Sequence, residues 1–171
     1  MGTDIHCIAI DANGKPIEGG KWVDGKDNDL EFGHGDGEPF GWRNYGVFSF
    51  LAGVRNYSGI APISEPRGLP PEFSDYFREE YEFDLGDHSF SWLSVAELVA
   101  FDYERIAVDR RGTEHYFSPD GTYAGSGGGI TLPENCGKAV SYRNFLGSAF
   151  FHDLAELQRI GADRVVFGFD S

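Results

Sequence analysis

Three short stretches of the sequence place an arginine, an asparagine and an aromatic ring side by side. They are Arg43-Asn44-Tyr45, Arg55-Asn56-Tyr57 and Arg143-Asn144-Phe145. Arginine grips phosphate or carboxylate with a planar fork of N–H donors, and an aromatic ring can stack on a nucleobase. Asparagine is also a preferred helix N-cap, so the same triplets can equally mark helix starts whose ring enters the core. The sequence alone leaves both interpretations open.

The functional interpretation requires that helix starts and arginines meet at one place. If the helices expected to begin near Asn44 and Asn144 converge, Arg43 and Arg143 lie beside exposed helix N–H groups and form an anion site. Arg67 stands between two prolines in "EPRGLP", which restrict its backbone and so pre-set its direction, although it can also simply pair with Glu65. The predicted ligand-binding residues are Arg43, Asn44, Tyr45, Arg55, Tyr57, Arg67, Trp92, Arg143 and Asn144.

A second group of residues has the chemistry of a cation site or an acid–base site. Asp4 and His6 are two positions apart and share one face of the expected first strand, while Asp87 and His88 precede an expected helix. Imidazole and carboxylate groups bind divalent metals, and His152-Asp153 could join them. No His-x-x-x-His spacing supports this, so we predict no metal and no cofactor. A divalent metal on Asp4, His6, Asp87 and His88 is the alternative.

Composition limits the classes of partner. A chain of 171 residues fits a single domain, 1–171, and its net charge of −14 opposes the phosphate contacts of a nucleic-acid-binding surface. No run is apolar enough to span a bilayer, and Cys7 and Cys136 match no disulfide framework, so we expect a protein of a reducing cytoplasm. Fifteen Phe and three Trp suggest exposed apolar surface and therefore a homo-oligomer.

The elements that must position these residues follow from local patterns. We expect a β-hairpin over 3–23 with its turn at Asn13-Gly14, a loop over 24–41, and a helix from Asn44 to Gly53. After a Pro-punctuated segment over 60–73, helices are expected over 72–83, from a capping box at Ser94, and over 142–160. Short antiparallel strands are expected over 104–124, a flexible stretch over 125–137 and a closing strand over 164–170. The predicted class is α+β, an antiparallel sheet with about four helices packed on it.

Five stretches of the chain resemble a family of uncharacterised proteins of bacteriophages and prophages. These stretches are "MGTDIH", "RNYGVFSFLAGVRN", "PISEPRGLP", "HSFSWLSVAEL" and "RVVFGFD". They occur in this order from the first residue almost to the last, whereas the intervening loops look individual. The resemblance implies a phage-associated protein in the bacterial host cell cytoplasm and transfers no catalytic residue.

Taken together, these observations favour a non-catalytic, phage-associated counter-defence protein. It would bind a small anionic, nucleotide-type immune signal and sequester that signal from its host effector. A metal-dependent hydrolase of a phosphodiester or nucleotide is the first alternative. An acidic inhibitor that mimics nucleic acid or docks on a basic host protein is the second, and it depends only on the net charge.

Overall fold

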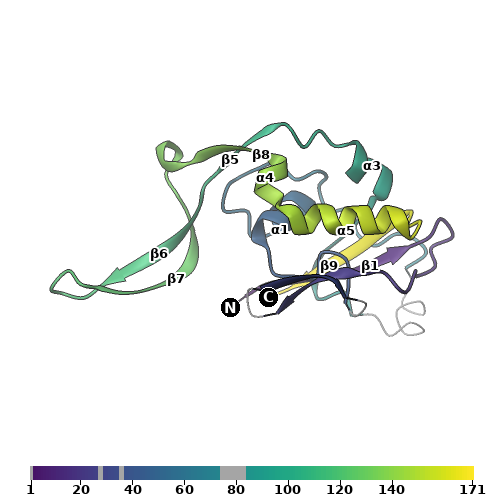
Figure 1. The fold of residues 1–171 in the computed structure, drawn as a ribbon, viewed down its shortest axis with the longest axis horizontal. Coiled ribbons are helices and arrows are strands. Elements are labelled where there is room, and N and C mark those ends of the chain that lie inside the picture. The colour runs from purple at the N-terminus through teal and green to yellow at the C-terminus, as the bar shows by residue number, and fades with distance from the viewer. Residues whose placement is uncertain (1, 27–28, 35–36, 74–83) are drawn as a thin grey trace.

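A three-stranded antiparallel sheet forms the centre of the molecule. The computed structural model describes residues 2–26, 29–34, 37–73 and 84–171. Strands β1 (Asp4–Ile10), β9 (Arg164–Asp170) and β4 (His88–Ser94) pair in the order β1-β9-β4. The register places Asp4 opposite Asp170 and Ile10 opposite Arg164, so the two ends of the chain lie side by side (Figure 1). The predicted closing strand is confirmed. It is the middle strand because it pairs with both β1 and β4, and its five consecutive residues 165–169 are buried.

Four helices occur in the described part of the chain. They are α1 (Tyr45–Ala52), α3 (Val95–Ala100), α4 (Tyr142–Leu146) and α5 (Ser148–Arg159). Figure 1 shows α1, α4 and α5 above one face of the β1–β9 pair. The structure therefore confirms the predicted α+β class. No helix of the described residues is both long and apolar enough to cross a membrane.

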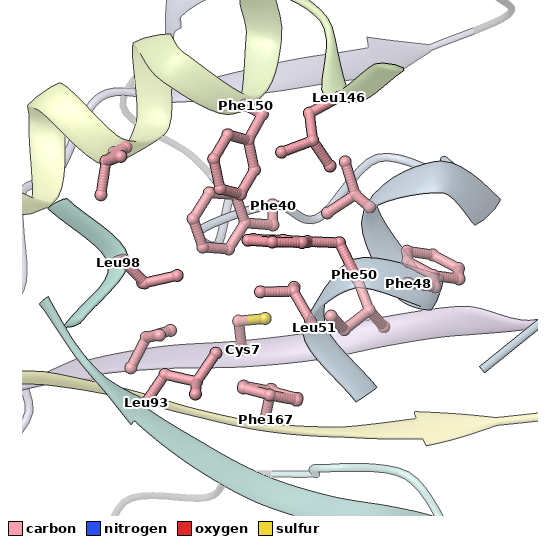
Figure 2. Close-up of a cluster of buried hydrophobic side chains, with 14 of the residues drawn as sticks. Cys7, Phe40, Phe48, Phe50, Leu51, Leu93, Leu98, Leu146, Phe150 and Phe167 are labelled. Carbon is pink, nitrogen blue, oxygen red and sulfur yellow. The ribbon is translucent and has the colours of Figure 1, made fainter. Parts of the chain in front are cut away.

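The core between helices and sheet is built largely from phenylalanine. The rings of Phe40 and Phe150 stack with centroids 5.0 Å apart, and Phe50 meets Phe150 edge-on at 5.7 Å. Figure 2 shows these rings between α5 and the sheet, with Leu93 and Phe167 below them. A smaller cluster that includes Ile8, Phe73, Leu85 and Val166 covers the opposite face. Most aromatic residues of the described chain therefore lie in the core.

Three two-stranded sheets surround this centre. They are β2 (Trp22–Lys26) with β3 (Asp29–His34), β5 (Ile106–Asp109) with β8 (Lys138–Ser141), and β6 (Arg111–Phe117) with β7 (Tyr123–Thr131). A short 3₁₀ turn, η1 (Glu134–Cys136), precedes β8. The β6–β7 hairpin, residues 111–131, extends away from the rest of the molecule in Figure 1. We call this hairpin the arm.

The strand predictions were right about local conformation and wrong about partners. The turn at Asn13-Gly14 forms, with Gly14 at φ 80°, but the return is a single bridge between Ile10 and Pro16. Strand β2 pairs with β3 instead, inside the range predicted as a loop. Similarly, the stretch predicted to be flexible supplies most of β7. Pairing partners far along the chain decide these cases, and short-range patterns do not report them.

Helix signals were more informative. Asn44 caps α1 by accepting from the backbone N–H groups of Gly46 and Val47 at 2.9 and 3.3 Å, and Gly53 ends the helix at φ 71°, as predicted. The predicted capping box of Ser94 and Glu97 is present at α3, and the Pro-punctuated segment has neither helix nor strand. The predicted helix over 72–83 falls almost entirely outside the described residues.

The expected long helix over 142–160 is instead two helices. Gly147, at φ 85° and ψ 168°, separates α4 from α5. The cap of α4 is Ser141, whose Oγ accepts from the Asn144 backbone N–H at 3.1 Å. Asn144 is therefore inside a helix, and its predicted place at a helix start is wrong.

Candidate functional site

The paired ends of β1 and β9 carry a group of interacting charged side chains. Arg43, just before α1, donates from Nε and Nη2 to the two carboxylate oxygens of Asp4 at 2.7 and 2.6 Å. The backbone N–H of Asp4 donates to Oδ1 of Asp170, its partner across the two strands, at 3.2 Å. Two bonds thus join Arg43 and Asp4, and this bidentate geometry is the one in which arginine binds a carboxylate or phosphate most specifically.

The same group continues along β1 through a histidine. Nε2 of His6 lies 2.9 Å from Oδ2 of Asp170, and Nδ1 lies 3.6 Å from Oε1 of Glu38. The other oxygen of Glu38 accepts from the backbone N–H of Cys7 at 2.6 Å. An imidazole thus lies between two carboxylates, each of which is oriented by a backbone N–H group. We call the following residues the terminal cluster: Asp4, His6, Glu38, Arg43 and Asp170.

Three of the predicted ligand-binding residues lie next to this cluster. Thr3 is fully buried, its N–H donates to the Tyr45 hydroxyl at 3.3 Å, and its Oγ1 accepts from Nε of Arg55 at 2.7 Å. The Arg55 guanidinium lies 5.9 Å from the centre of the Tyr45 ring, which in turn is 6.0 Å from the ring of Tyr57. The first residue of α1 and the turn that follows the helix therefore place Tyr45 and Arg55 beside the beginning of β1.

His88 joins the group from β4, where the backbone is strained. Its Nδ1 lies 2.9 Å from Oγ of Ser89 and its Nε2 lies 3.0 Å from Oγ of Ser171. Ser89 and Arg55 have φ angles of 54° and 50°, which few residues other than glycine adopt. Such conformations cost on the order of 1–3 kcal/mol each and occur preferentially at functional sites.

The charges of the terminal cluster influence one another. Burial opposes protonation of His6, but its hydrogen bond to Asp170 and the nearby carboxylates outweigh burial, so its pKa is raised above 6.5. Burial raises the pKa of the Glu38 carboxyl, although the Cys7 N–H and His6 act against this. The hydrogen bond from His6 lowers the pKa of Asp170. A protonated His6 between two carboxylates is thus the favoured state over part of the acidic pH range.

Glu38 also lines a pocket of about 500 Å³. The walls come from the outer edge of β1 and from residues 16–20, 37–39 and 84–85. Ile17, Trp22 and Leu85 make part of its lining apolar, and Glu18 and Asp84 add further carboxylates. Its size is within the range of sites for small organic ligands.

Arg67 and Trp92 belong to a different surface. Arg67 forms a fork with Glu97 at 2.9 and 2.6 Å, and its guanidinium stacks 4.7 Å from the centre of the Trp92 ring. Arg164 approaches the same ring at 5.7 Å. The partner of Arg67 is thus Glu97, in the first turn of α3, and not Glu65 as the sequence suggests. These contacts link the Pro-rich segment to the helix.

Arg143 and Asn144 lie at another place again. Nε of Arg143 donates to Glu104 at 2.7 Å, and its guanidinium lies 4.6 Å from the centre of the Phe151 ring. Both residues line a pocket of about 360 Å³ with Gly147, Ser148 and Phe151, and Arg43 is not among its lining residues. The structure therefore divides the predicted arginines among three places.

The alternative metal set is not assembled in the described part of the chain, where no three His, Cys, Asp or Glu side chains are arranged to hold a metal ion. The carboxylate of Asp4 is bonded to Arg43, and the ring of His6 is bonded to Asp170. The ring of His88 contacts Ser89 and Ser171. Asp153 is fully buried and accepts from the N–H groups of Val23 and Phe40 at 3.0 and 2.9 Å. Its carboxylate therefore anchors the core.

Three residues of the site region were not predicted from the sequence. Glu38 follows a Gly-rich stretch without a pattern, and Asp170 gains its role only through the pairing of β9 with β1. Arg111 forms a fork with Asp109 at 2.9 and 2.7 Å, and its guanidinium lies so close to Gly46 that a side chain there would collide with it. Only the Asp-x-Arg spacing hints at the last of these contacts.

No protein-family model, curated protein or solved structure matches this chain. Its function therefore has to be argued from the geometry of its own residues.

Proposed function

We propose that the protein binds a small anionic, nucleotide-type ligand along the terminal cluster and the adjoining pocket. The observation that carries this proposal is the unbroken chain of contacts from Arg43 to Glu38. It runs beside β1 from Asp4 to Cys7, a distance of roughly 10 Å at about 3.3 Å per residue. A ligand that reaches both ends must be larger than a single phosphate ion.

The anionic part of the ligand would bind at Arg43. Its ion pair with Asp4 is half exposed, with 53% and 47% of the two side chains accessible. Exposed ion pairs are worth only about 0–1 kcal/mol, so phosphate oxygens can replace Asp4 at low cost. Arg55, His6 and His88 add positive or protonatable groups nearby. These groups offset part of the charge of the three carboxylates of the terminal cluster, whereas most of the surface of a protein of net charge −14 repels an anion.

The flat, heterocyclic part of the ligand would occupy the pocket. Apolar walls that include Ile17 and Trp22 remove a ring system from water, and the Glu38 carboxylate can accept hydrogen bonds from ring N–H or amino groups. Because the Cys7 N–H holds one oxygen of Glu38, the carboxylate has a fixed direction before a ligand arrives. Fixed acceptors lower the entropic cost of binding.

The biological role that we propose is capture of a nucleotide-type immune signal without cleavage, as a phage counter-defence. This part rests on the resemblance to phage and prophage proteins and on no contact in the structure.

One feature favours a second candidate function, hydrolysis by acid–base catalysis. Asp170 fixes one nitrogen of His6, as a carboxylate does when it orients a catalytic imidazole. Through Nδ1, His6 could then take a proton from a water molecule whose oxygen attacks the phosphoryl group beside Arg43. The phosphorus–oxygen bond to the leaving group would break, and the protonated His6 would return the proton to the departing oxygen.

The proposal is tested by calorimetric titration of a panel of linear and cyclic nucleotides into three proteins. Arg43→Ala removes the fork, and Arg143→Ala is a matched control because each arginine bonds one carboxylate and has a similar exposure, 53% and 52%. Loss of a charge-assisted hydrogen bond costs about 1.5–3 kcal/mol, a weakening of roughly ten- to a hundredfold or more. We expect this loss for Arg43→Ala only. Equal affinity of parent and Arg43→Ala would refute the site.

The fate of the ligand separates the two candidate functions. After incubation, the protein is heat-denatured and the released ligand is analysed by mass spectrometry. Intact ligand supports capture. Hydrolysed ligand supports the second candidate, provided that His6→Gln binds the ligand and releases it intact.

A further inference from the structure

The arm has features of a surface that binds another protein chain. Its strands β6 and β7 form a sheet of two strands, and neither pairs with a third strand of the described residues. Figure 1 shows the arm extending far from the central sheet and from α5. A two-stranded sheet is at best marginally stable in water without further packing. Its outer part therefore gains most from a partner.

One face of the arm near its tip is aromatic. Phe117 lies opposite Tyr123 in the register, with ring centroids 6.0 Å apart, and His115 meets the Tyr123 ring at 5.9 Å. The two larger residues are 64% and 56% exposed. Neighbouring exposed rings of this kind mark interaction sites, whereas isolated exposed apolar residues are ordinary.

The edge of β7 is open to strand pairing. Its sequence, "YAGSGGGIT", contains no charged residue and no proline over nine positions. Natural edge strands usually carry lysines, prolines, inward-pointing charges or β-bulges that prevent pairing with other chains. Of these devices β7 has only bulges, because its register with β6 shifts between Thr113 and Glu114 and between Tyr116 and Phe117. Four of the nine residues are glycines, so β7 presents few side chains of its own to a second backbone, and the Tyr57 ring lies against it only at Gly129.

Charge indicates which partner fits. Residues 110–138 contain three basic and three acidic residues, so the arm and its base are neutral while the remainder carries the whole net charge of −14. A basic partner would be attracted to the remainder and not to the arm. Two copies of this chain repel one another everywhere except through their neutral arms.

We propose that the arm binds the arm of a second copy of this chain, with β7 antiparallel to β7 about a two-fold axis near Gly127. This pairing places Tyr123 opposite Thr131 of the other copy and turns two hairpins into one four-stranded sheet. Closed two-fold dimers are the commonest soluble oligomers, and a sheet of more than two strands is independently stable when one face is apolar. The inference is independent of the proposed ligand.

Light scattering after size-exclusion chromatography, over a wide range of protein concentration, tests this interface. We expect the parent mass to approach twice 18.9 kDa. The double variant Phe117→Asp/Tyr123→Asp should remain a monomer at all concentrations. Phe32→Asp is the matched control, because Phe32 is a 51% exposed aromatic on the other hairpin, β2–β3, and it should leave the dimer unchanged.

A charge on the edge itself tests the strand pairing. Ser126→Lys places an ammonium beside the two-fold axis and should weaken dimerisation by at least tenfold, with circular dichroism confirming that the variants are folded. A parent that stays at 18.9 kDa, or a dimer that survives the aromatic double variant, would overturn the interface. A dimer lost in the double variant but intact in Ser126→Lys would overturn the β7–β7 pairing.

Discussion

At the scale of single residues, the function of a charged side chain depends on its partner. Sequence reasoning selected Arg43, Arg55, Arg67 and Arg143 as anion-binding groups, and each of them has an intramolecular partner. The capacity to bind an anion can be predicted from the sequence, because arginine has distinctive chemistry. The partner was not readable, because Asp4, Thr3, Glu97 and Glu104 lie 30 to 52 positions away from their arginines.

The pairing of His6 with Asp170 should be visible in titrations. Nuclear magnetic resonance of the His6 ring should give a pKa above 6.5 in the parent and a lower pKa in Asp170→Asn. His6 has a raised pKa, so its contribution to stability is present below 6.5 and is lost as pH rises through the raised value. Asp170 has a lowered pKa, so its contribution is present above 3.8. The stability gap between the two proteins should therefore be greatest between these values. A gap independent of pH would exclude the ion pair.

Asp153 provides a test of a buried acceptor. Asp153→Ala leaves the N–H groups of Val23 and Phe40 without their partner. Each unsatisfied buried donor costs about 1–3 kcal/mol, so the loss of a partner for two donors should lower the free energy of unfolding in urea by roughly 2–6 kcal/mol. Gln158→Ala, on the exposed side of the same helix, is the control and should change it little. A small effect of Asp153→Ala would mean that water reaches these groups.

At the scale of elements, local signals predicted helices well and strand partners poorly. The N-caps of α1 and α3 are predicted correctly because N-capping depends on residues two or three positions apart. Most of the β2–β3 hairpin and most of β7 are predicted as loops, because glycine and aspartate are frequent in the first stretch and glycine is frequent in the second. Gly147 was read as an ordinary helix residue, since the sequence around it has continuous helical spacing.

The break at Gly147 predicts the sign of a substitution. In a continuous helix Gly→Ala would stabilise the protein by about 1 kcal/mol. At φ 85° and ψ 168° alanine is strained, so Gly147→Ala should instead lower the free energy of unfolding by about 1–3 kcal/mol. Ser148→Ala, the next residue, is the control for a small side-chain change. A Gly147→Ala variant that is more stable than the parent would contradict the break and would support a single helix over 142–160.

At the scale of the whole molecule, the candidate site depends on the meeting of the two chain ends. The sequence singles out Asp4 and His6, but only as part of the alternative metal site. Their partner Asp170 is more than 160 positions away, and nothing in a single sequence shows that the first and last strands pair. The fold class was predictable because it depends on the types and order of elements. The site was not, because it depends on their pairing.

The net charge leads to a prediction for the whole molecule. A charge of −14 repels itself within the folded state, and salt screens this repulsion, with a Debye length of about 10 Å at 0.1 M. The melting temperature should therefore rise when sodium chloride is increased from about 0.01 to about 0.2 M. A constant or falling melting temperature would mean that the ion pairs of the surface outweigh its repulsion. Sucrose at matched osmolality controls for solute effects unrelated to charge.

The central claim is that a nucleotide-type ligand binds along β1, between Arg43 and the pocket at Glu38. The most direct measurement is to titrate the tightest-binding nucleotide of the panel into isotopically labelled protein and follow the backbone amide resonances. The account predicts that the largest shifts fall on residues 4–9, 16–22, 37–45 and 168–171. Shifts concentrated on residues 143–151, which contain the pocket beside Arg143, would contradict it.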